Sequence, residues 1–197
     1  MDDNKRVITS PDIDHVAAAF RESARNFEAL TAEAGAVVAA ARMIVEALRG
    51  GGKAIFCGNG GSAADSQHLA AELMGRYLKD REPLAAVALT TDSSALTAIG
   101  NDYAFDEIFA RQLRGLGRKG DVLIGISTSG NSRNVVAAFE AAKSRGIATI
   151  ALTGAKGGAM RPLADLCIAV PSSDTPRVQE MHIAVGHMIC DLIERAF

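Results

Sequence analysis

A histidine and a glutamate spaced for one helix face are the first residues that could do chemistry. His68 and Glu72 lie four residues apart in a stretch that follows a Gly-rich segment. On a helix, side chains at this spacing project from the same face, so they could share a metal ion or a substrate. The same spacing also occurs in ordinary solvated pairs on protein surfaces. This pair therefore predicts a site only if other polar groups meet it.

A second polar group lies near the C-terminus, in a segment that is otherwise apolar. It consists of Gln179, Glu180, His182 and His187. Polar side chains among apolar neighbours need partners, and two such helices side by side would supply them to each other. At about 100° per residue, Glu180 and His187 are nearly in line, and Gln179 lies about 80° from His187. Spacing alone leaves the choice of ligands open, and His182 could equally be a satisfied core residue.

A hydroxyl-rich loop predicts a phosphate site. Ser127, Thr128, Ser129 and Ser132 fall within six residues, directly before a predicted helix. Hydroxyls together with the backbone N–H groups of a helix start can donate to the three acceptor oxygens of a phosphate monoester. Ordinary N-capping needs only one such hydroxyl. A nucleophile elbow is excluded because Ser129 stands where that motif needs glycine, and no Gly-Lys-Ser/Thr follows to make a P-loop.

An earlier Gly-rich turn, residues 58–62, could also hold an anion. Its glycines allow a tight turn with the backbone N–H groups pointing outward, at the start of a helix. Gly58, Gly60 and Ala63 also match the G-x-G-x-x-A form of the dinucleotide fingerprint. The acidic residue that this fingerprint needs about 20 residues later is missing, so a nicotinamide enzyme is the weaker interpretation.

Short apolar runs alternate with longer amphipathic stretches along most of the chain. Continuous apolar runs suit strands that are covered on both faces, as in a parallel sheet. The predicted strands are residues 54–57, 84–89, 122–126, 148–152 and 166–170. The predicted connecting helices are residues 63–78, 94–113, 131–145 and 177–195. This order predicts a doubly wound α/β fold with a five-stranded, flavodoxin-like parallel sheet, whose ligands bind at the carboxyl ends of the strands.

Two helices precede the first strand. One begins near Ser10-Pro11, and the other covers residues 34–48 and ends at three glycines. We expect residues 1–36 to form an N-terminal helical extension used in oligomerisation, and residues 37–197 to form the sheet domain.

Composition narrows the possible classes. The chain has 197 residues, 48% of them hydrophobic, and a formal net charge of -2. This charge balance argues against a dedicated nucleic-acid-binding protein. The polar start of the chain lacks the apolar run of a secretory signal, so we expect a cytoplasmic protein without a membrane span. The three cysteines are far apart in apolar segments, which favours buried free thiols.

Taken together, these motifs resemble those of the phosphoheptose isomerases, which belong to the sugar isomerase (SIS) domain superfamily. The matching segments are C-G-N-G-G-S at 57–62, H-x-x-x-E at 68–72, G-R at 75–76, G-N-D at 100–102, G-I-S-T-S-G-N-S at 125–132, and R-V-Q-E-M-H at 177–182 followed by His187. The resemblance covers nearly the whole chain. It implies a homotetramer with active sites at subunit interfaces.

The resemblance also implies roles for individual residues. The phosphate cradle would be Ser127, Thr128, Ser129 and Ser132. The sugar contacts would be Asn59, Gly60, Gly61, Glu72, Asn101, Asp102 and Gln179. The zinc ligands would be His68, Glu72, Gln179 and His187, with one zinc ion per subunit. Glu72 would be the catalytic base and His187 its acid/base partner.

The implied reaction interconverts sedoheptulose 7-phosphate and D-glycero-D-manno-heptose 7-phosphate through an enediol, for lipopolysaccharide or capsule synthesis. The competing class is a non-catalytic sugar-phosphate sensor or replication-initiator adaptor; those adaptors look to have lost the equivalents of Glu72 and His187, which are present here. One departure from the family pattern is Ala155, which takes a position that is often basic and is followed by Lys156. Roles for Lys156, Asp174 and Arg177 do not follow from the resemblance.

Overall fold

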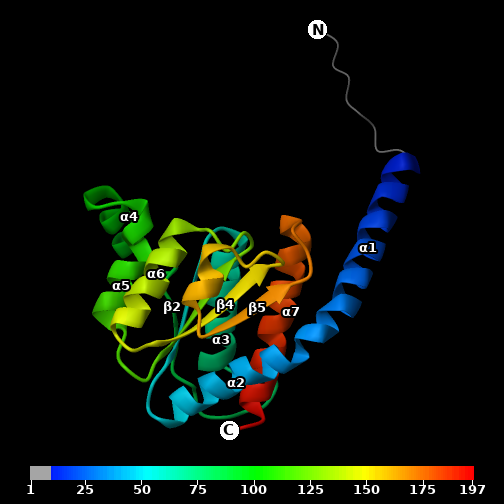
Figure 1. The fold of residues 1–197 in the computed structure, drawn as a ribbon. Coiled ribbons are helices and arrows are strands. Elements are labelled where there is room, and N and C mark those ends of the chain that lie inside the picture. The colour runs from blue at the N-terminus through cyan, green and yellow to red at the C-terminus, as the bar shows by residue number, and fades with distance from the viewer. Residues whose placement is uncertain (1–9) are drawn as a thin grey trace.

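The apolar runs of the sequence form one parallel sheet in the computed structural model, which describes residues 10–197 (Figure 1). The strands are β1 (Ala54–Gly58), β2 (Ala86–Ala88), β3 (Val122–Ser127), β4 (Ala148–Gly154) and β5 (Leu166–Val170). Their order in the sheet is β2-β1-β3-β4-β5, and every neighbouring pair is parallel. The predicted doubly wound sheet of five strands is therefore confirmed.

Helices cover both faces of the sheet, which explains why the strands are apolar throughout. The α-helices are α1 (Ser10–Leu30), α2 (Ala34–Arg49), α3 (Gly61–Met74), α4 (Ser93–Asp102), α5 (Ile108–Leu116), α6 (Arg133–Ser144) and α7 (Thr175–Glu194). Short 3-10 turns are η1 (Thr31–Glu33), η2 (Phe105–Glu107) and η3 (Gly158–Leu163). One buried cluster joins α2, α3 and α7 to the sheet, and a second joins α5 and α6 to it.

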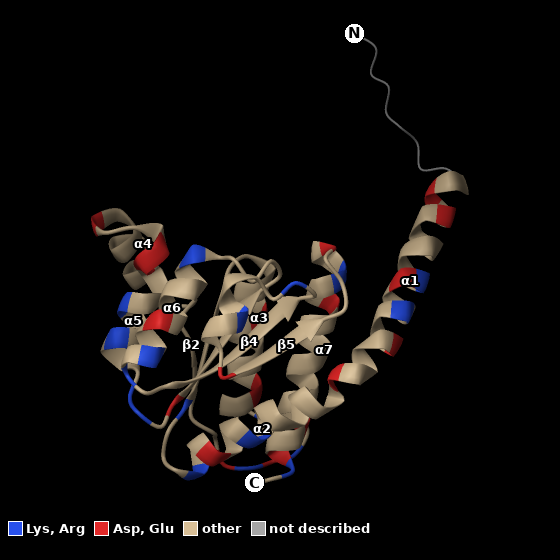
Figure 2. Ribbon diagram, viewed as in Figure 1, with Lys and Arg blue, Asp and Glu red and all other residues tan. Residues whose placement is uncertain are grey.

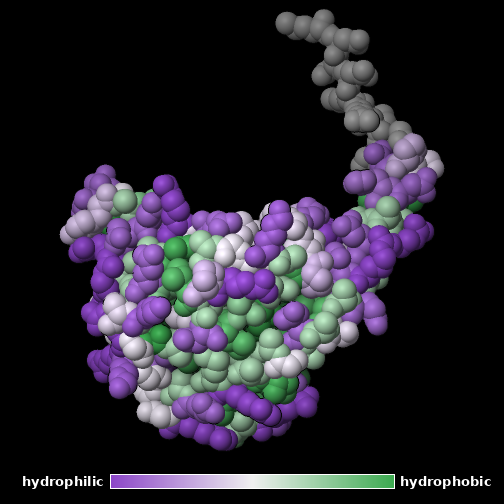
Figure 3. Space-filling view, viewed as in Figure 1, coloured by the Kyte–Doolittle hydropathy of each residue, from purple (hydrophilic) through white to green (hydrophobic). Residues whose placement is uncertain are grey.

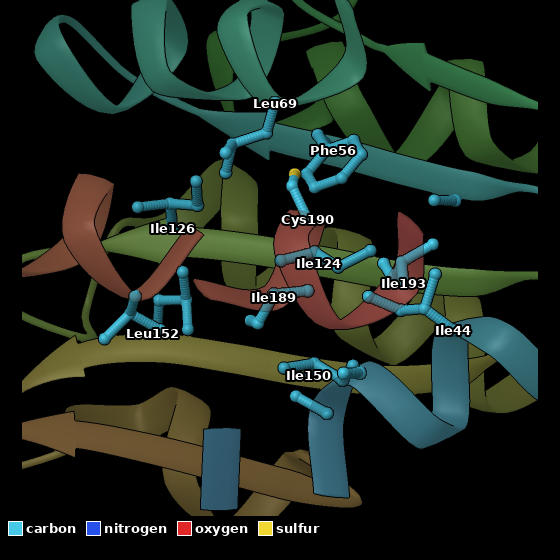
Figure 4. Close-up of a cluster of buried hydrophobic side chains, with 14 of the residues drawn as sticks. Ile44, Phe56, Leu69, Ile124, Ile126, Ile150, Leu152, Ile189, Cys190 and Ile193 are labelled. Atoms are coloured by element: carbon cyan, nitrogen blue, oxygen red, sulfur yellow. The ribbon is translucent and has the colours of Figure 1, made fainter. Parts of the chain in front are cut away.

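The larger cluster holds the helices that carry the histidines. Figure 4 shows side chains of α2, α3 and α7 interleaved with side chains of the central strands; those labelled are Ile44, Phe56, Leu69, Ile124, Ile126, Ile150, Leu152, Ile189, Cys190 and Ile193. Burying these apolar groups stabilises the fold by removing their surface from water. The same packing holds α3 and α7 in register with each other.

Two connections differ from the sequence-based prediction. The stretch 94–113 was expected to be one helix, but it divides into α4, η2 and α5, because Ala104 is extended (φ -167°, ψ 156°). The helix predicted to reach residue 78 ends at Met74. It ends there because the Glu194 carboxylate accepts the backbone N–H groups of residues 77–79, which holds them out of the helix.

The N-terminal helices differ in how they pack. All of α1 is described and none of its residues is buried, whereas α2 buries five residues against the sheet domain. Figure 1 shows α1 projecting away from the body. The expected boundary between residues 36 and 37 thus falls inside α2, and residues 1–9 of the expected extension lie outside the described part of the chain.

Surface properties complete the description of the fold. Acidic and basic residues are interspersed along the outer helices (Figure 2). In the described part of the chain, no helix combines the length and the hydropathy that crossing a bilayer requires. All three cysteines are free thiols, but only Cys57 and Cys190 are buried as predicted, and Cys167 is half-buried. Burial raises the pKa of Cys57 and of Cys190 to about 12.

Candidate active site

The histidine-bearing segments meet where α3 runs beside α7. His68 Nε2 lies 3.0 Å from His187 Nε2 and 3.3 Å from Glu72 Oε1. The two imidazole rings pack edge to face, with centroids 5.2 Å apart. Helix α3 places His68 and Glu72 on one face, and the shared core of α3 and α7 brings His187 to that face. The pairing of the two polar helices, which the sequence predicted, is present in the structure.

This cluster fits a zinc ion. The ligand atoms of His68, Glu72 and His187 all lie within 4.8 Å of one another. A tetrahedral zinc ion with bonds of about 2.0–2.1 Å asks for ligands about 3.3 Å apart, so a small adjustment of these side chains would accommodate it. Two imidazoles and a carboxylate, with a fourth position open, are typical of catalytic zinc sites.

Gln179, the fourth predicted ligand, lies on α7 beside the start of α3. Its side chain packs against the start of α3, where a Cβ added at Gly61 would lie 2.6 Å from Gln179 Nε2. Gly61 precedes His68 by seven residues, which is about 10 Å of helix. The printed contact of Gln179 is thus with the start of α3, whereas His68, Glu72 and His187 meet further along the same helix.

The hydroxyl loop after β3 forms a compact cradle. Ser127 Oγ lies 2.9 Å from Ser132 Oγ and 3.5 Å from Ser129 Oγ. Ser132 is the N-cap residue of α6, yet its side chain makes no capping hydrogen bond. The capping interpretation therefore does not explain this hydroxyl, which faces the other serines at the start of a helix. Such an arrangement suits an anion with several acceptor oxygens.

A cavity of about 270 Å³ opens beside this loop. It is lined by Thr128, Ser129, Asn131, Gly154, Ala155, Lys156 and Ser173. Lys156 thus contributes a positive charge near the hydroxyls, although the sequence did not assign it a role. Arg177 does not reach this cavity, because it donates to Ser23 Oγ and the Ala19 carbonyl on α1 and pairs with Glu180. Asp174 is the N-cap residue of α7.

The Gly-rich turn after β1 is tied to the hydroxyl loop. Gly60 is the N-cap residue of α3. Its φ of +56° is a backbone conformation that favours glycine. The side chain of Asn59 exchanges two hydrogen bonds with Asn134, at 2.9 Å and 2.8 Å. Asn134 is buried on the first turn of α6. The sequence analysis missed Asn134; the signal was a polar residue on the inward face of a helix, directly after the serines.

Asn101 and Asp102 stand apart from the other predicted site residues. They end α4, are both exposed, and are joined by a 2.9 Å hydrogen bond from Asn101 Nδ2 to Asp102 Oδ1. Figure 1 shows α4 over the far edge of the sheet, away from α7.

Two further side chains border the histidine cluster. One carboxylate oxygen of Asp65, one helical turn before His68, is buried and has no hydrogen-bond partner among the described residues. Burial raises the pKa of Asp65, while the nearby His68 and His187 act to lower it. The ring of Tyr77 lies 5.9 Å from that of His187, centroid to centroid. Burial, then the negative charge of Asp191, raises the pKa of Tyr77.

The turn that carries Glu72 is held by a buried ion pair. Arg81 donates to the carbonyls of Glu72 and Leu73 at the end of α3, and its Nε lies 3.5 Å from Glu194 Oε1. Burial alone would raise the pKa of Glu194, but three backbone N–H groups and Arg81 outweigh it and hold the pKa below its usual value. Glu194 is an acidic residue at the C-terminal end of α7, where the helix dipole disfavours a negative charge. That unfavourable position is the sequence signal that Glu194 needs a cationic partner such as Arg81.

Comparison with known proteins agrees with this geometry. A family model described as SIS domain matches residues 19–154. A phosphoheptose isomerase of Rhodospirillum rubrum is 62% identical over 161 residues, 82% of this chain and 86% of that protein. One from Akkermansia muciniphila is 58% identical over 172 residues, 87% of this chain and 91% of that protein. The solved phosphoheptose isomerase of Neisseria gonorrhoeae is 50% identical, with a TM-score of 0.88 over 92% of this chain and 98% of that chain. The chain therefore belongs to the phosphoheptose isomerase family of SIS-domain proteins.

Proposed function

We propose that the protein interconverts sedoheptulose 7-phosphate and D-glycero-D-manno-heptose 7-phosphate. The observation that carries this proposal is the carboxylate of Glu72 beside His68 and His187, in a chain whose relatives at 62% and 58% identity are named phosphoheptose isomerase. Non-catalytic relatives with a sensor or adaptor role would not need this carboxylate.

The chemistry follows from moving a carbonyl group between C2 and C1. In the open-chain ketose, the Glu72 carboxylate removes a proton from C1, and the resulting enediol is protonated at C2 by the same carboxyl group. His187 moves the protons of the two oxygens and assists ring opening. Removing the Glu72 carboxylate would therefore stop proton transfer while the phosphate-binding hydroxyls stay in place.

Substrate binding divides between a phosphate-binding loop and a set of sugar contacts. Ser127, Thr128, Ser129 and Ser132 hold the phosphate, supported by the cavity that Lys156 lines. Asn59, Gly60, Gly61, Gln179, Asn101 and Asp102 contact the sugar. Because the β1 and β3 loops flank the point where the strand order reverses, the sugar lies in the crevice that doubly wound sheets use for ligands.

Zinc is the proposed cofactor, one ion per subunit. His68, Glu72 and His187 would hold it, as their convergence supports. When bound, zinc would act as a Lewis acid that stabilises negative charge on oxygen. Gln179 is the proposed fourth ligand, although glutamine is an unusual zinc ligand and its side chain lies beside the start of α3.

We propose a homotetramer with active sites at subunit interfaces. Several observations support it: Ile13, Val16, Phe20 and Phe27 are exposed along α1, and a groove of about 330 Å³ runs between α1, α2 and α7. Figure 3 shows apolar residues gathered on the body of the molecule between hydrophilic rims. Gln179, Asn101 and Asp102 would then complete sites on neighbouring subunits. We place the reaction in the cytoplasm, feeding nucleotide-heptose synthesis for lipopolysaccharide or capsule.

The proposal is tested with Glu72→Gln, which keeps the shape of the side chain and removes the base. Proton NMR of the protein with sedoheptulose 7-phosphate should show aldoheptose anomeric signals for the wild type. The variant should be slower by about 100-fold or more, the lower range for general acid–base catalysis, and should stay folded. Glu140→Gln, an exposed carboxylate on α6, is the matched control and should retain full activity.

The alternatives have distinct outcomes. Activity retained in Glu72→Gln would assign proton transfer to another residue. A wild-type protein that binds the sugar phosphate without converting it would instead be a sensor or an adaptor.

A further inference from the structure

Asn59 and Asn134 form a pair of hydrogen bonds between their side-chain amides. Among the described residues, this is the only amide pair that joins the Gly-rich turn after β1 to the segment after β3. Asn59 Nδ2 donates to Asn134 Oδ1 at 2.9 Å, and Asn134 Nδ2 donates to Asn59 Oδ1 at 2.8 Å. The two residues are 75 positions apart in the chain. A reciprocal pair of this kind fixes both the distance and the relative orientation of the two amide planes.

The pair spans the place where a ligand is expected. Asn59 follows β1 and Asn134 lies on the helix that follows β3, and β1 and β3 are neighbours at the point where the strand order reverses. Asn134 comes two residues after Ser132 of the phosphate cradle, and Asn59 precedes Gly60 and Gly61. The pair therefore links the sugar loop directly to the phosphate loop.

Burial makes Asn134 costly to leave unpaired. Its exposed fraction is 2%, whereas Asn59 is half-buried at the edge of the crevice. A buried amide that loses its hydrogen-bond partner is left with the free-energy cost of its own desolvation. The hydrogen-bonded state of the pair is therefore strongly favoured. Each amide also keeps one N–H and one lone pair beyond those used in the pair, and only those of Asn59 face a half-open position.

We infer that Asn134 is a positioning residue of the active site, which holds the Asn59 amide and thereby sets the spacing between the sugar loop and the phosphate loop. It acts through Asn59 and does not itself touch the substrate. This inference rests on the proposed function, because it assigns a role within the same site. Its consequence is that the substrate meets a loop spacing fixed before binding.

The test is a double-mutant cycle with Asn59→Ala, Asn134→Ala and the double variant, measured as kcat/KM. Each single variant should lose about 10- to 100-fold, as expected when reacting groups are misplaced by about 1 Å. If Asn134 acts through Asn59, the double variant should match Asn59→Ala within about twofold, the usual error of additivity. Multiplied losses would show that Asn134 acts independently, and would overturn the inference.

A control near the amino-terminal end of β4, the end opposite to the ligand loops, separates a purely structural role. Thr149 is buried there, and its hydroxyl donates to Asp165 Oδ2 at 2.9 Å and accepts from the Asp165 N–H at 3.0 Å. Thr149→Val should lower the melting temperature while leaving kcat/KM unchanged. An Asn134→Ala variant that also lost only stability, with kcat/KM intact, would overturn the inference.

Two further experiments distinguish a failure of this inference from a failure of the proposed function. Calorimetric Kd values for sedoheptulose 7-phosphate give the same cycle without turnover, so a protein that binds but does not isomerise still tests Asn134. If Asn134→Ala does not fold, Asn134→Asp replaces it, since Asp keeps the acceptor for Asn59 Nδ2, loses the donor to Asn59 Oδ1 and adds a negative charge at that position. An Asp variant with unchanged kcat/KM and Kd would also overturn the inference.

Discussion

His68 is the residue at which the chemistry of the two helices converges. Its Nε2 atom faces both His187 Nε2, at 3.0 Å, and Glu72 Oε1, at 3.3 Å. Two imidazole nitrogens at this distance need either a proton between them or a shared cation, because two bare lone pairs repel. The residue types and distances therefore favour a group that binds a cation.

The hydroxyls of the phosphate loop should affect binding more than turnover. Ser129→Ala removes one donor to a phosphate, a charge-assisted hydrogen bond of about 1.5–3 kcal/mol, so KM should rise by about 10- to 100-fold with kcat nearly unchanged. Steady-state kinetics on the sugar phosphate measures this. Ser144→Ala removes a hydroxyl bonded to the Ala141 carbonyl at the far end of α6, and should change neither constant. An unchanged KM in Ser129→Ala would remove Ser129 from the cradle.

His182 should make the fold sensitive to acid. It is buried on α7, and burial lowers its pKa to about 4 from 6.5, with the backbone of Thr153 acting in the opposite direction. The folded state favours the neutral imidazole of His182. Above pH 6.5 the imidazole is neutral in both states, so the protein keeps its full stability there with respect to this group. As pH falls from about 6.5 to about 4, the unfolded state binds the proton first and up to about 3 kcal/mol of stability is lost.

Urea unfolding of wild type and His182→Leu at several pH values tests this prediction. The wild type should lose more stability than the variant between pH 7 and pH 4, since only the wild type has this titration. Parallel pH profiles for the two proteins would show that His182 does not control acid sensitivity.

At the level of elements, the contact between α3 and α7 decides whether the histidines meet. Gly186 lies on α7 against Leu69 of α3, where an added Cβ would come within 2.6 Å of Leu69 Cδ2. Leu69 is itself buried in the core beside the sheet. The absence of a side chain at Gly186 therefore allows the two helices to approach closely enough for His187 to reach His68.

Gly186→Ala should therefore weaken metal binding more than it weakens the fold. Alanine gains about 1 kcal/mol of helix propensity, while overpacking costs about 1–3 kcal/mol, so the net loss of stability should be small. Moving α7 away from α3 should lower zinc affinity, measured by competition with a chelating dye. Gly115→Ala, at a helical position with open space around it, should leave zinc affinity unchanged. Equal zinc affinities for Gly186→Ala and wild type would contradict this account.

At the level of the whole molecule, α1 projects from its subunit and carries an exposed apolar stripe. Ile13, Val16, Phe20 and Phe27 follow helical spacing along one face and are all exposed, Phe20 to 71%. Its contacts with the body include Leu30, which packs against the core, and Ser23, whose Oγ donates to Glu180 and accepts from Arg177. An apolar stripe of this length is typical of an interface between subunits.

Phe20→Asp should reduce the mass of the assembly in solution. A charge in the middle of the apolar stripe would have to be desolvated on association, which opposes the contact. Light scattering coupled to size-exclusion chromatography measures the mass. Arg21→Glu, one residue and about 100° further round the helix, is the matched control and should leave the mass unchanged. A Phe20→Asp protein of wild-type mass would place the interface elsewhere.

The local sequence was enough to predict the layout of the sheet and its loops. Each predicted strand overlaps an observed one, because a continuous apolar run that must be buried on both faces leaves few alternatives to a covered parallel strand. The hydroxyl run before α6 and the pair His68 and Glu72 are also local patterns, since their spacing depends only on the helix or turn that carries them. These features are determined by neighbours in the sequence.

Only the tertiary structure decided which of these groups meet. The contact of His68 with His187, the packing of Gln179 against Gly61, and the pairing of Asn59 with Asn134 join positions that are far apart in the chain. The end of α3 at Met74 also depends on Glu194, more than a hundred residues later. Helix propensity and periodicity do not contain these distances, because they arise from how the core packs α3, α6 and α7 onto the sheet.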